Sequence, residues 1–207
     1  MIAQTRENFI PDPRFIPMQP GLEAHLAKMG DAISPVNFMS IFEAGLLKLL
    51  QDSFDKIRAD EGSIWLLDEA RENLVVAYNS GPNADQIVGF KQPLNQGIVS
   101  LVVATEQAFV ENQVYKNAKH SPRLDQKIRS TTYAMIAVPF YFVNQIRGVI
   151  SCVQLISVTG QNEIASSNNI PPGFQPQHLP VIQTAATILR DLIDYRLLGT
   201  AVGWNRR

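Results

Sequence analysis

The chain has 207 residues, of which 45% are hydrophobic, and a formal net charge of −1 at pH 7. This suits one large domain, or one domain with helical extensions, around a sizeable buried core. Lysine and arginine are scattered rather than gathered into a basic stripe, so we expect no nucleic-acid partner. A single cysteine, Cys152, excludes an internal disulfide and a multi-cysteine zinc site and favours a reducing, cytoplasmic setting.

No segment has the pattern of a signal peptide or a membrane span. Residues 1–17 lack a basic start followed by an apolar core. The most apolar stretch, residues 133–156, is interrupted by Pro139, Asn144 and Arg147 at intervals that suit strands better than a spanning helix. We therefore expect no membrane insertion.

The first third of the chain is predicted to be mainly helical. Prolines punctuate residues 1–20 and predict an irregular arm, followed by a short helix over residues 21–32. Apolar residues then recur at helical spacing from Phe38 to Ile57, which predicts one continuous helix over residues 35–60.

The periodicity then changes to that of strands. Two β-branched and aromatic runs, residues 62–68 and 73–79, are separated by a polar turn and predict a hairpin. A third extended piece is predicted over residues 87–94. Residues 95–107 are β-branched but also fit successive helical turns, and we interpret them as a helix. Residues 108–112 read as a short strand.

A polar segment, residues 112–132, holds no long apolar run and is called the lid below. It is predicted to contain one short helix that begins near Ser121 and Pro122, where proline suits the first helical position.

Two strands that are apolar on both faces follow the lid and should be covered on both sides. One face of the first is predicted to carry Ala134 and the alternate residues after it, and the other face Tyr133 and its alternates. Asn144 tolerates the positive φ of a tight turn between the two strands. Gly148 leaves room for a neighbouring backbone, and Pro139 suggests an edge position or a bulge.

The chain closes with a polar loop over residues 159–177 and an amphipathic helix that starts at His178. Gly199 is a natural stop for that helix. The predicted organisation is an arm with a short helix (1–36), a domain that includes the terminal helices (37–199) and a tail (200–207).

This order predicts an α+β fold. A central antiparallel sheet of about five or six strands carries the N- and C-terminal helices on one face and the lid, with its short helices, on the other. A covered sheet with a movable lid is a common way to enclose a small ligand.

Three segments together resemble a GAF domain, a GAF/PAS-like fold. They are the hairpin over residues 62–81, the segment over 89–112 with its Pro-Leu and Gly-Ile pairs, and the lid and strands over 121–156. The order and spacing of the segments carry the resemblance, which covers roughly residues 38–198. It implies a pocket between lid and sheet that holds cyclic nucleotides, bilins, haem, other small molecules, or nothing known.

The subfamilies make different demands on the residues. Bilin-binding members need a cysteine in or near the lid, and none lies between residues 109 and 135. Members that reduce methionine sulfoxide cycle a disulfide, which one cysteine cannot do within a chain. Cyclic-nucleotide members of phosphodiesterases carry Asn-Lys and Asp-Glu pairs where this chain has Ser157-Val158 and His178-Leu179; only Phe174 matches. The cofactor or ligand therefore stays unknown.

The candidate ligand-binding residues are polar or aromatic and flank the presumed mouth of the pocket. They are Asn112, Tyr115, His120, Arg123, Asp125, Thr132 and Tyr133. Each has an alternative interpretation: His120 as an exposed loop residue, Arg123 and Asp125 as a solvated helix face, and the others as ordinary lid residues. No histidines share a metal-ligand spacing, and no base accompanies Ser151, so we expect neither a metal site nor catalysis.

Two hypotheses of function remain. In one, the chain is a signal-transduction sensor that binds a small molecule between sheet and lid and relays the change through its terminal helices to a signalling protein or output domain. In the other, it is a ligand-free dimerisation scaffold of a regulatory system. In both we expect a homodimer, because Ile188, Tyr195 and Leu198 lie off the main apolar stripe of the last helix.

Overall fold

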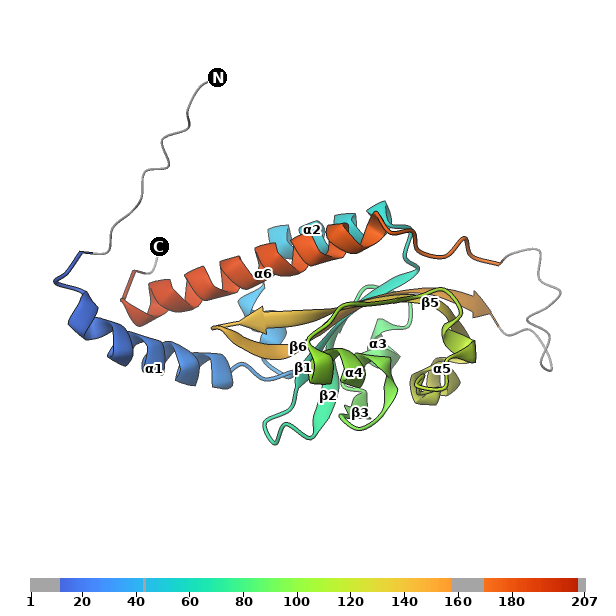
Figure 1. Ribbon diagram of the computed structural model, residues 1–207, viewed down its shortest axis with the longest axis horizontal. Coiled ribbons are helices and arrows are strands. Elements are labelled where there is room, and N and C mark those ends of the chain that lie inside the picture. The colour runs from blue at the N-terminus through green and yellow to red at the C-terminus, as the bar shows by residue number, and fades with distance from the viewer. Residues whose placement is uncertain (1–11, 43, 158–169, 205–207) are drawn as a thin grey trace, which may run out of the picture.

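The computed structural model describes residues 12–42, 44–157 and 170–204. Its centre is a six-stranded antiparallel sheet with the strand order β3-β2-β1-β6-β5-β4 (Figure 1). The strands are β1 (Glu61–Leu67), β2 (Asn73–Asn79), β3 (Lys91–Pro93), β4 (Phe109–Glu111), β5 (Ser130–Phe142) and β6 (Gln145–Ser157). The α+β class and the antiparallel sheet are therefore confirmed.

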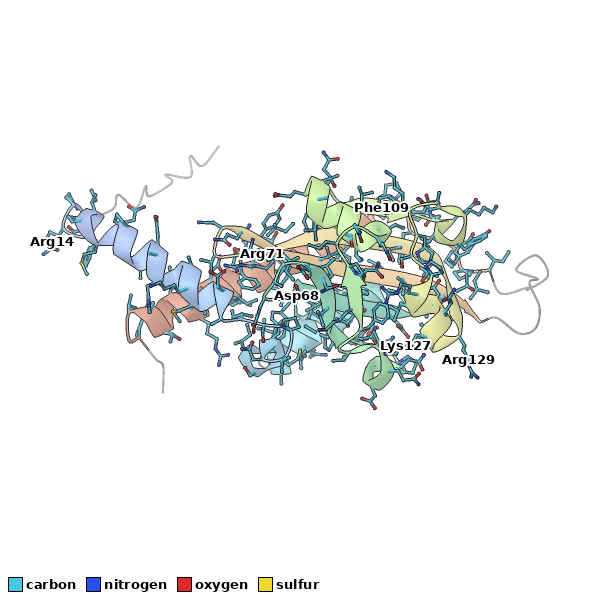
Figure 2. The ribbon with its side chains drawn as sticks, turned by 90° about the horizontal axis from the view of Figure 1, so that it is seen from below. Arg14, Asp68, Arg71, Phe109, Lys127 and Arg129 are labelled. Atoms are coloured by element: carbon cyan, nitrogen blue, oxygen red, sulfur yellow. The ribbon has the colours of Figure 1, made fainter. Side chains whose placement is uncertain are left out.

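Helices cover both faces of the sheet. The α-helices are α1 (Gln19–Asp31), α2 (Ala44–Lys56), α3 (Ala84–Ile87), α4 (Gly97–Thr105), α5 (Arg123–Ile128) and α6 (His178–Ala201); short 3₁₀ turns are η1 (Ile16–Met18), η2 (Phe38–Ile41) and η3 (Val114–Lys116). Helices α2 and α6 lie on one side of the sheet, which we call the helix face. Helices α3, α4 and α5 and the turn η3 lie on the other side, which we call the lid face (Figure 1). Helix α1 runs beside α6, as the two views in Figure 1 and Figure 2 show.

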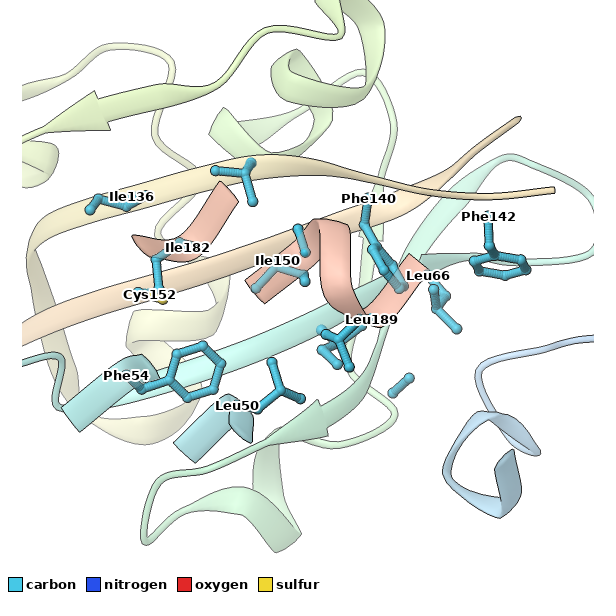
Figure 3. Close-up of a cluster of buried hydrophobic side chains, with 14 of the residues drawn as sticks. Leu50, Phe54, Leu66, Ile136, Phe140, Phe142, Ile150, Cys152, Ile182 and Leu189 are labelled. Atoms are coloured by element: carbon cyan, nitrogen blue, oxygen red, sulfur yellow. The ribbon is translucent and has the colours of Figure 1, made fainter. Parts of the chain in front are cut away.

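The helix face holds the larger apolar core. Alternate residues of β5 and β6 point toward α2 and α6, so that Phe140 and Ile150 meet Leu50, Phe54 and Leu189 (Figure 3). All five side chains are at most 1% exposed. Burial of this kind contributes about 25 cal/mol for each Å² of apolar surface, so this layer is the main source of folding energy.

The β5–β6 hairpin is the longest pairing in the sheet, from Ser130 opposite Ser157 to Phe142 opposite Gln145. Its two-residue turn has both central residues at positive φ, 52° at Val143 and 53° at Asn144. Such a turn matches the twist of the strands. A β-branched residue strongly disfavours positive φ, and here the Asp194 carboxylate of α6 accepts a hydrogen bond from the Val143 N–H at 2.7 Å.

The two special residues of this hairpin behave as predicted. A Cβ on Gly148 would lie 1.8 Å from the Trp65 carbonyl oxygen, so the glycine admits the neighbouring backbone. Strand β4 pairs only with Met135 to Ala137, so Pro139 lies beyond the end of that edge strand, and a register shift follows at Phe140.

The predicted continuous helix over residues 35–60 is wrong. The chain forms η2, becomes extended at Phe42 (ψ 132°), and starts again as α2 at Ala44. The break leaves the Phe38 ring fully buried, 4.7 Å from the Phe42 ring and 6.2 Å from the Phe140 ring. Packing of these rings overrides the helical periodicity.

Two predicted helix boundaries, the start of the first helix and the end of the last, also differ from those in the structure. The arm is helical from Ile16 onward, with Pro20 near the start of α1, where a proline is tolerated. Helix α6 passes Gly199 and ends at Ala201, because Gly203, at φ 71°, supplies the left-handed residue that terminates it. The division at residues 36 and 199 stays a prediction.

Most of the polar loop predicted over residues 159–177 lies outside the described residues. In the described ranges, no helix has both the length and the apolarity that a membrane crossing requires.

Candidate functional site

A small cavity lies on the lid face between the sheet and the lid. Its volume is about 60 Å³, and its walls come from β1, β3, β5 and β6 on one side and from α4, α5 and the turn before α5 on the other. The lining residues are Glu61, Ser63, Trp65, Gln92, Gly97, Ile98, Val99, His120, Ser121, Leu124, Asp125, Ile128, Thr132, Met135, Ser151, Val153 and Leu155.

The sheet side of the cavity is formed by alternate residues of neighbouring strands. Residues 61, 63 and 65 of β1 face the lid because Ile64 and Leu66, which alternate with them along the strand, face the helices. The Trp65 indole Nε1–H donates to the Ser151 hydroxyl across the strand pair at 2.9 Å. This bond fixes the indole as a wall of the cavity.

One carboxylate joins α5 of the lid to the first residues of β5. Asp125 of α5 accepts hydrogen bonds from the Thr132 backbone N–H at 2.9 Å and from the Thr132 hydroxyl at 2.7 Å. The His120 Nε2 lies 3.0 Å from the same carboxylate. The side chains of His120 and Asp125 are only 12% and 13% exposed, so these bonds are well shielded from water.

A second carboxylate, Glu61, lines the cavity from strand β1 and is only 4% exposed. Its Oε2 accepts a hydrogen bond from Asn79 Nδ2 at 3.2 Å, whereas its Oε1 is buried without a hydrogen-bond partner in the described part of the chain. Burial raises the pKa of Glu61, and the Asp60 charge adds to the rise, while the Asn79 and Asn83 amides oppose it.

The structure brings three of the seven predicted residues together. His120, Asp125 and Thr132 all line the cavity and are linked by the Asp125 carboxylate. The alternative interpretation of His120 as an exposed loop residue is wrong, because its ring is turned inward to reach Asp125.

The other four predicted residues lie outside this cavity. The Asn112 side chain donates to and accepts from the Phe174 backbone, at 3.0 and 2.7 Å, and so holds the chain before α6. Arg123 is exposed, with its guanidinium 5.9 Å from the Phe90 ring centre. Tyr115 and Tyr133 stack on each other with ring centres 6.0 Å apart. The role of these four residues in ligand binding stays a prediction.

The predicted orientation of Tyr133 is wrong. Tyr133 packs with the helix-face core, although Met135 two residues later faces the lid. The β5–β6 register shifts between Thr132 and Ala134, and this bulge inserts one extra residue into the alternation. Thr132 therefore reaches the cavity and Tyr133 turns away.

Sequence reasoning missed the polar residues that come from the sheet. They are Glu61, Ser63, Gln92 and Ser151. Polar residues at 61 and 63, on the same face of a strand whose other face is apolar, were the available signal. That signal could not show that the face would be covered by the lid.

The sulfur and metal chemistry of the described residues is limited. Cys152 is fully buried on the helix face, where burial raises the pKa of its thiol and disfavours the reactive thiolate. In the part of the chain that the structure describes, no three His, Cys, Asp or Glu side chains gather as a metal site would require.

No protein-family model and no curated protein matches the sequence. Solved structures do match. The GAF domain of an Acinetobacter phosphoenolpyruvate-protein phosphotransferase superposes with a TM-score of 0.55 at 20% identity, over 91% of this chain and 98% of that chain. The chain has a GAF-domain fold. The corresponding GAF domain from Coxiella burnetii gives 0.54 at 15% identity, over 77% of this chain and 97% of that one.

The same GAF-domain fold also serves an enzyme. The free methionine-R-sulfoxide reductase of Neisseria meningitidis, solved in complex with its substrate, has a TM-score of 0.54 at 16% identity, over 88% of each chain. At such identities the likeness establishes the fold alone.

Proposed function

We propose that this chain is a sensory or regulatory module that takes up a small molecule between the sheet and the lid and relays its binding through the terminal helices. The observation that carries the proposal is a cavity lined by both polar and apolar side chains beneath α5, which the Asp125 carboxylate joins to the start of β5. Buried polar groups cost stability, and a cavity that concentrates them is typical of a binding site.

The volume of the cavity limits the size of the ligand that can enter without movement of the lid. Ligand pockets usually measure roughly 300 Å³ or more, several times the 60 Å³ found here. Any molecule of more than a few heavy atoms therefore needs the lid to move away from the sheet. Since α5 has only six residues and none of them is fully buried, it is the element that can move at least cost.

A route from the cavity to the terminal helices runs along the central hairpin. Strand β6 contributes Ser151 to the cavity, and near its start Arg147 forms an ion pair with Asp31 at the end of α1. Strand β5 contributes Thr132, and the turn after it is hydrogen-bonded to Asp194 of α6. A shift of the hairpin would reach both helices.

The rival function is a ligand-free dimerisation scaffold, and one observation favours it. Large apolar side chains are exposed along the C-terminal half of α6 and the residues that follow: Leu192, Tyr195, Leu198, Val202 and Trp204. An apolar strip of this kind is typical of an interface. We propose a homodimer through this strip in either case.

We also propose that the chain has no catalytic activity and works in the cytoplasm. The only cysteine of the sequence is buried and cannot cycle a disulfide within the chain, unlike the chemistry expected of a sulfoxide reductase.

A ligand screen would separate the two functions. Trp65 and Trp204 are the only tryptophans, so a Trp204→Phe variant makes indole fluorescence a reporter of the cavity wall. We expect at least one compound from a panel of nucleotides, haem, amino acids and aromatic acids to change Trp65 emission and raise the melting temperature by several degrees. In a Trp65→Phe control the same compound should change no emission, which shows that the signal comes from the cavity wall.

The outcome of sedimentation completes the test. A dimer that Leu198→Glu converts to monomer, together with no hit in the whole panel, would favour the scaffold over the sensor. A monomer at high micromolar concentration would contradict the dimer in both.

A further inference from the structure

We propose that the ligand of the lid cavity carries a protonated amine or amidine group, and that Glu61 receives this group at the sheet side of the cavity. This inference rests on the proposed function, because it names the class of ligand for the same site. The observation behind it is Glu61, a residue of the cavity lining whose Oε1 is shielded from water and has no hydrogen-bond partner in the described part of the chain.

The Glu61 carboxylate is held in position by its neighbours. Its side chain lies over Gly81, where any Cβ would come within 2.3 Å of it. Asn79 donates to Oε2 at 3.2 Å and is itself fixed, since its Nδ2 also lies 3.0 Å from the Ser63 hydroxyl and its Oδ1 accepts from the Gly81 N–H at 2.8 Å. One carboxylate oxygen is therefore engaged and oriented, and the other is left with its acceptor capacity unused.

The Asn79 and Asn83 amides offset the charge of Glu61 only in part, because the pKa of Glu61 is still raised. Among the described residues that line the cavity there is no lysine or arginine. The second acid, Asp125, is already engaged by Thr132 and His120. A buried carboxylate without a partner costs far more than one with a cationic donor beside it, so the cavity favours a positively charged group.

The remaining walls select an organic cation over a bare ion. Ile98, Leu124, Ile128, Met135 and Val153 line the same space, and these apolar side chains suit a short hydrocarbon portion beside the charged group. A metal ion would need several oxygen ligands, whereas an ammonium or amidinium supplies its own N–H donors to one carboxylate.

The Trp65 indole N–H resonance provides a direct test with the full chain. It lies on the cavity wall, and the exposed Trp204 indole serves as an internal reference. We expect n-propylammonium and acetamidinium, at millimolar concentrations, to shift the Trp65 signal of the ¹⁵N spectrum in a saturable way. The uncharged and anionic counterparts, 1-propanol and propionate, should leave it in place.

Substitution of the carboxylate gives the decisive comparison. Glu61→Gln should weaken n-propylammonium binding about ten-fold or more, the loss expected for one charge-assisted hydrogen bond. The matched control is Glu69→Gln, an exposed residue just past the end of the same strand, which should bind as the unsubstituted chain does. Retention of the other amide resonances shows that each variant is folded.

Four outcomes would overturn the inference. They are a Trp65 shift with propionate or propanol as large as with n-propylammonium, binding that Glu61→Gln leaves unchanged, a Glu61-dependent shift produced equally by K⁺, or no shift with either cation. Compounds from the wider panel that bind the cavity without an amine and without dependence on Glu61 would leave the proposed function standing while this inference fails. If no compound of any class reports on Trp65, the proposed function itself fails.

Discussion

The two faces of the sheet differ in the way they are filled. The helix face is closed mainly by apolar side chains, around Phe140 and Leu189, that pack against α2 and α6 (Figure 3). The lid face mixes an apolar cluster around Trp65 with buried polar groups: Glu61, Ser63, Asn79, Gln92, Ser100, Thr132 and Ser151. The helix face therefore stabilises the fold. The buried polar groups of the lid face lower its stability but provide specific polar contacts.

The largest expected effect tests the helix face. Phe140→Ala removes a fully buried ring that meets the rings of Phe38 and Phe142, with centres 6.2 and 5.8 Å away. It should lower the free energy of unfolding by about 3–5 kcal/mol, measured by denaturant titration. Phe15→Ala, at a 62% exposed residue, is the control and should change little. A loss below about 1 kcal/mol would contradict the assignment of this face as the main core.

The next largest effect on stability should come from the pairing of β1 with β6, which lies between the two faces. In Gly148→Ala the new methyl group would meet the Trp65 carbonyl oxygen, which belongs to the backbone and cannot rotate away. We expect a loss of about 1–3 kcal/mol, together with a changed Trp65 indole resonance because β1 must shift. Gly21→Ala, in helix α1 with open space around it, should cause no loss of stability and should leave the Trp65 resonance unchanged. An intact Trp65 resonance in Gly148→Ala would show that the strands are paired differently.

A smaller effect of opposite sign should come from the lid face. Glu61→Gln removes a charge that burial disfavours and should raise the free energy of unfolding by about 1 kcal/mol at neutral pH. Burial, with the nearby Asp60 charge, raises the pKa of Glu61 in the folded state, so the penalty is complete above that raised pKa and absent below the unfolded value.

The gain from Glu61→Gln should therefore disappear as the pH falls toward the ordinary pKa of a glutamate. Urea titrations of both chains across this range would measure it. A variant that is less stable than the unsubstituted chain at neutral pH would mean that the Glu61 carboxylate stabilises the fold, contrary to the comparison of the two faces.

The smallest global effect should come from the lid itself. Asp125→Asn weakens the bonds to Thr132 and His120, and we expect a local loss of about 1 kcal/mol that appears as faster amide hydrogen exchange over residues 120–132. Exchange in α6 should not change. Asp85→Asn, an exposed residue of α3, is the control. Uniformly faster exchange throughout the sheet would show that the lid is part of the global core.

The fold could be predicted further than the site, for a physical reason. The two-residue period of β5 and β6 fixes which residues face which layer, so Ile136 and Ile150 are found where the pattern places them. Where a bulge or ring packing interrupts the period, as at Tyr133 and between Phe38 and Ala44, the sequence pattern fails.

The site depends on contacts between distant segments, which a local pattern does not contain. Asp125 and Thr132 were predicted because both belong to the lid. Glu61 was not predicted. Its position in the cavity depends on the lid that covers it and on Gly81 beneath it, and neither can be inferred from the sequence of β1 alone.

The attachment of the chain just before α6 has a mechanical consequence. Gly173 donates its N–H to the Gln154 side chain at 2.9 Å, Asn112 holds Phe174 by two bonds, and the Phe174 ring is buried. This pins the entrance of a 24-residue helix, whose length is about 36 Å. A tilt of about 5° about this entrance would displace the far end by about 3 Å. Such a tilt would move the residues near Trp204 more than those near the entrance.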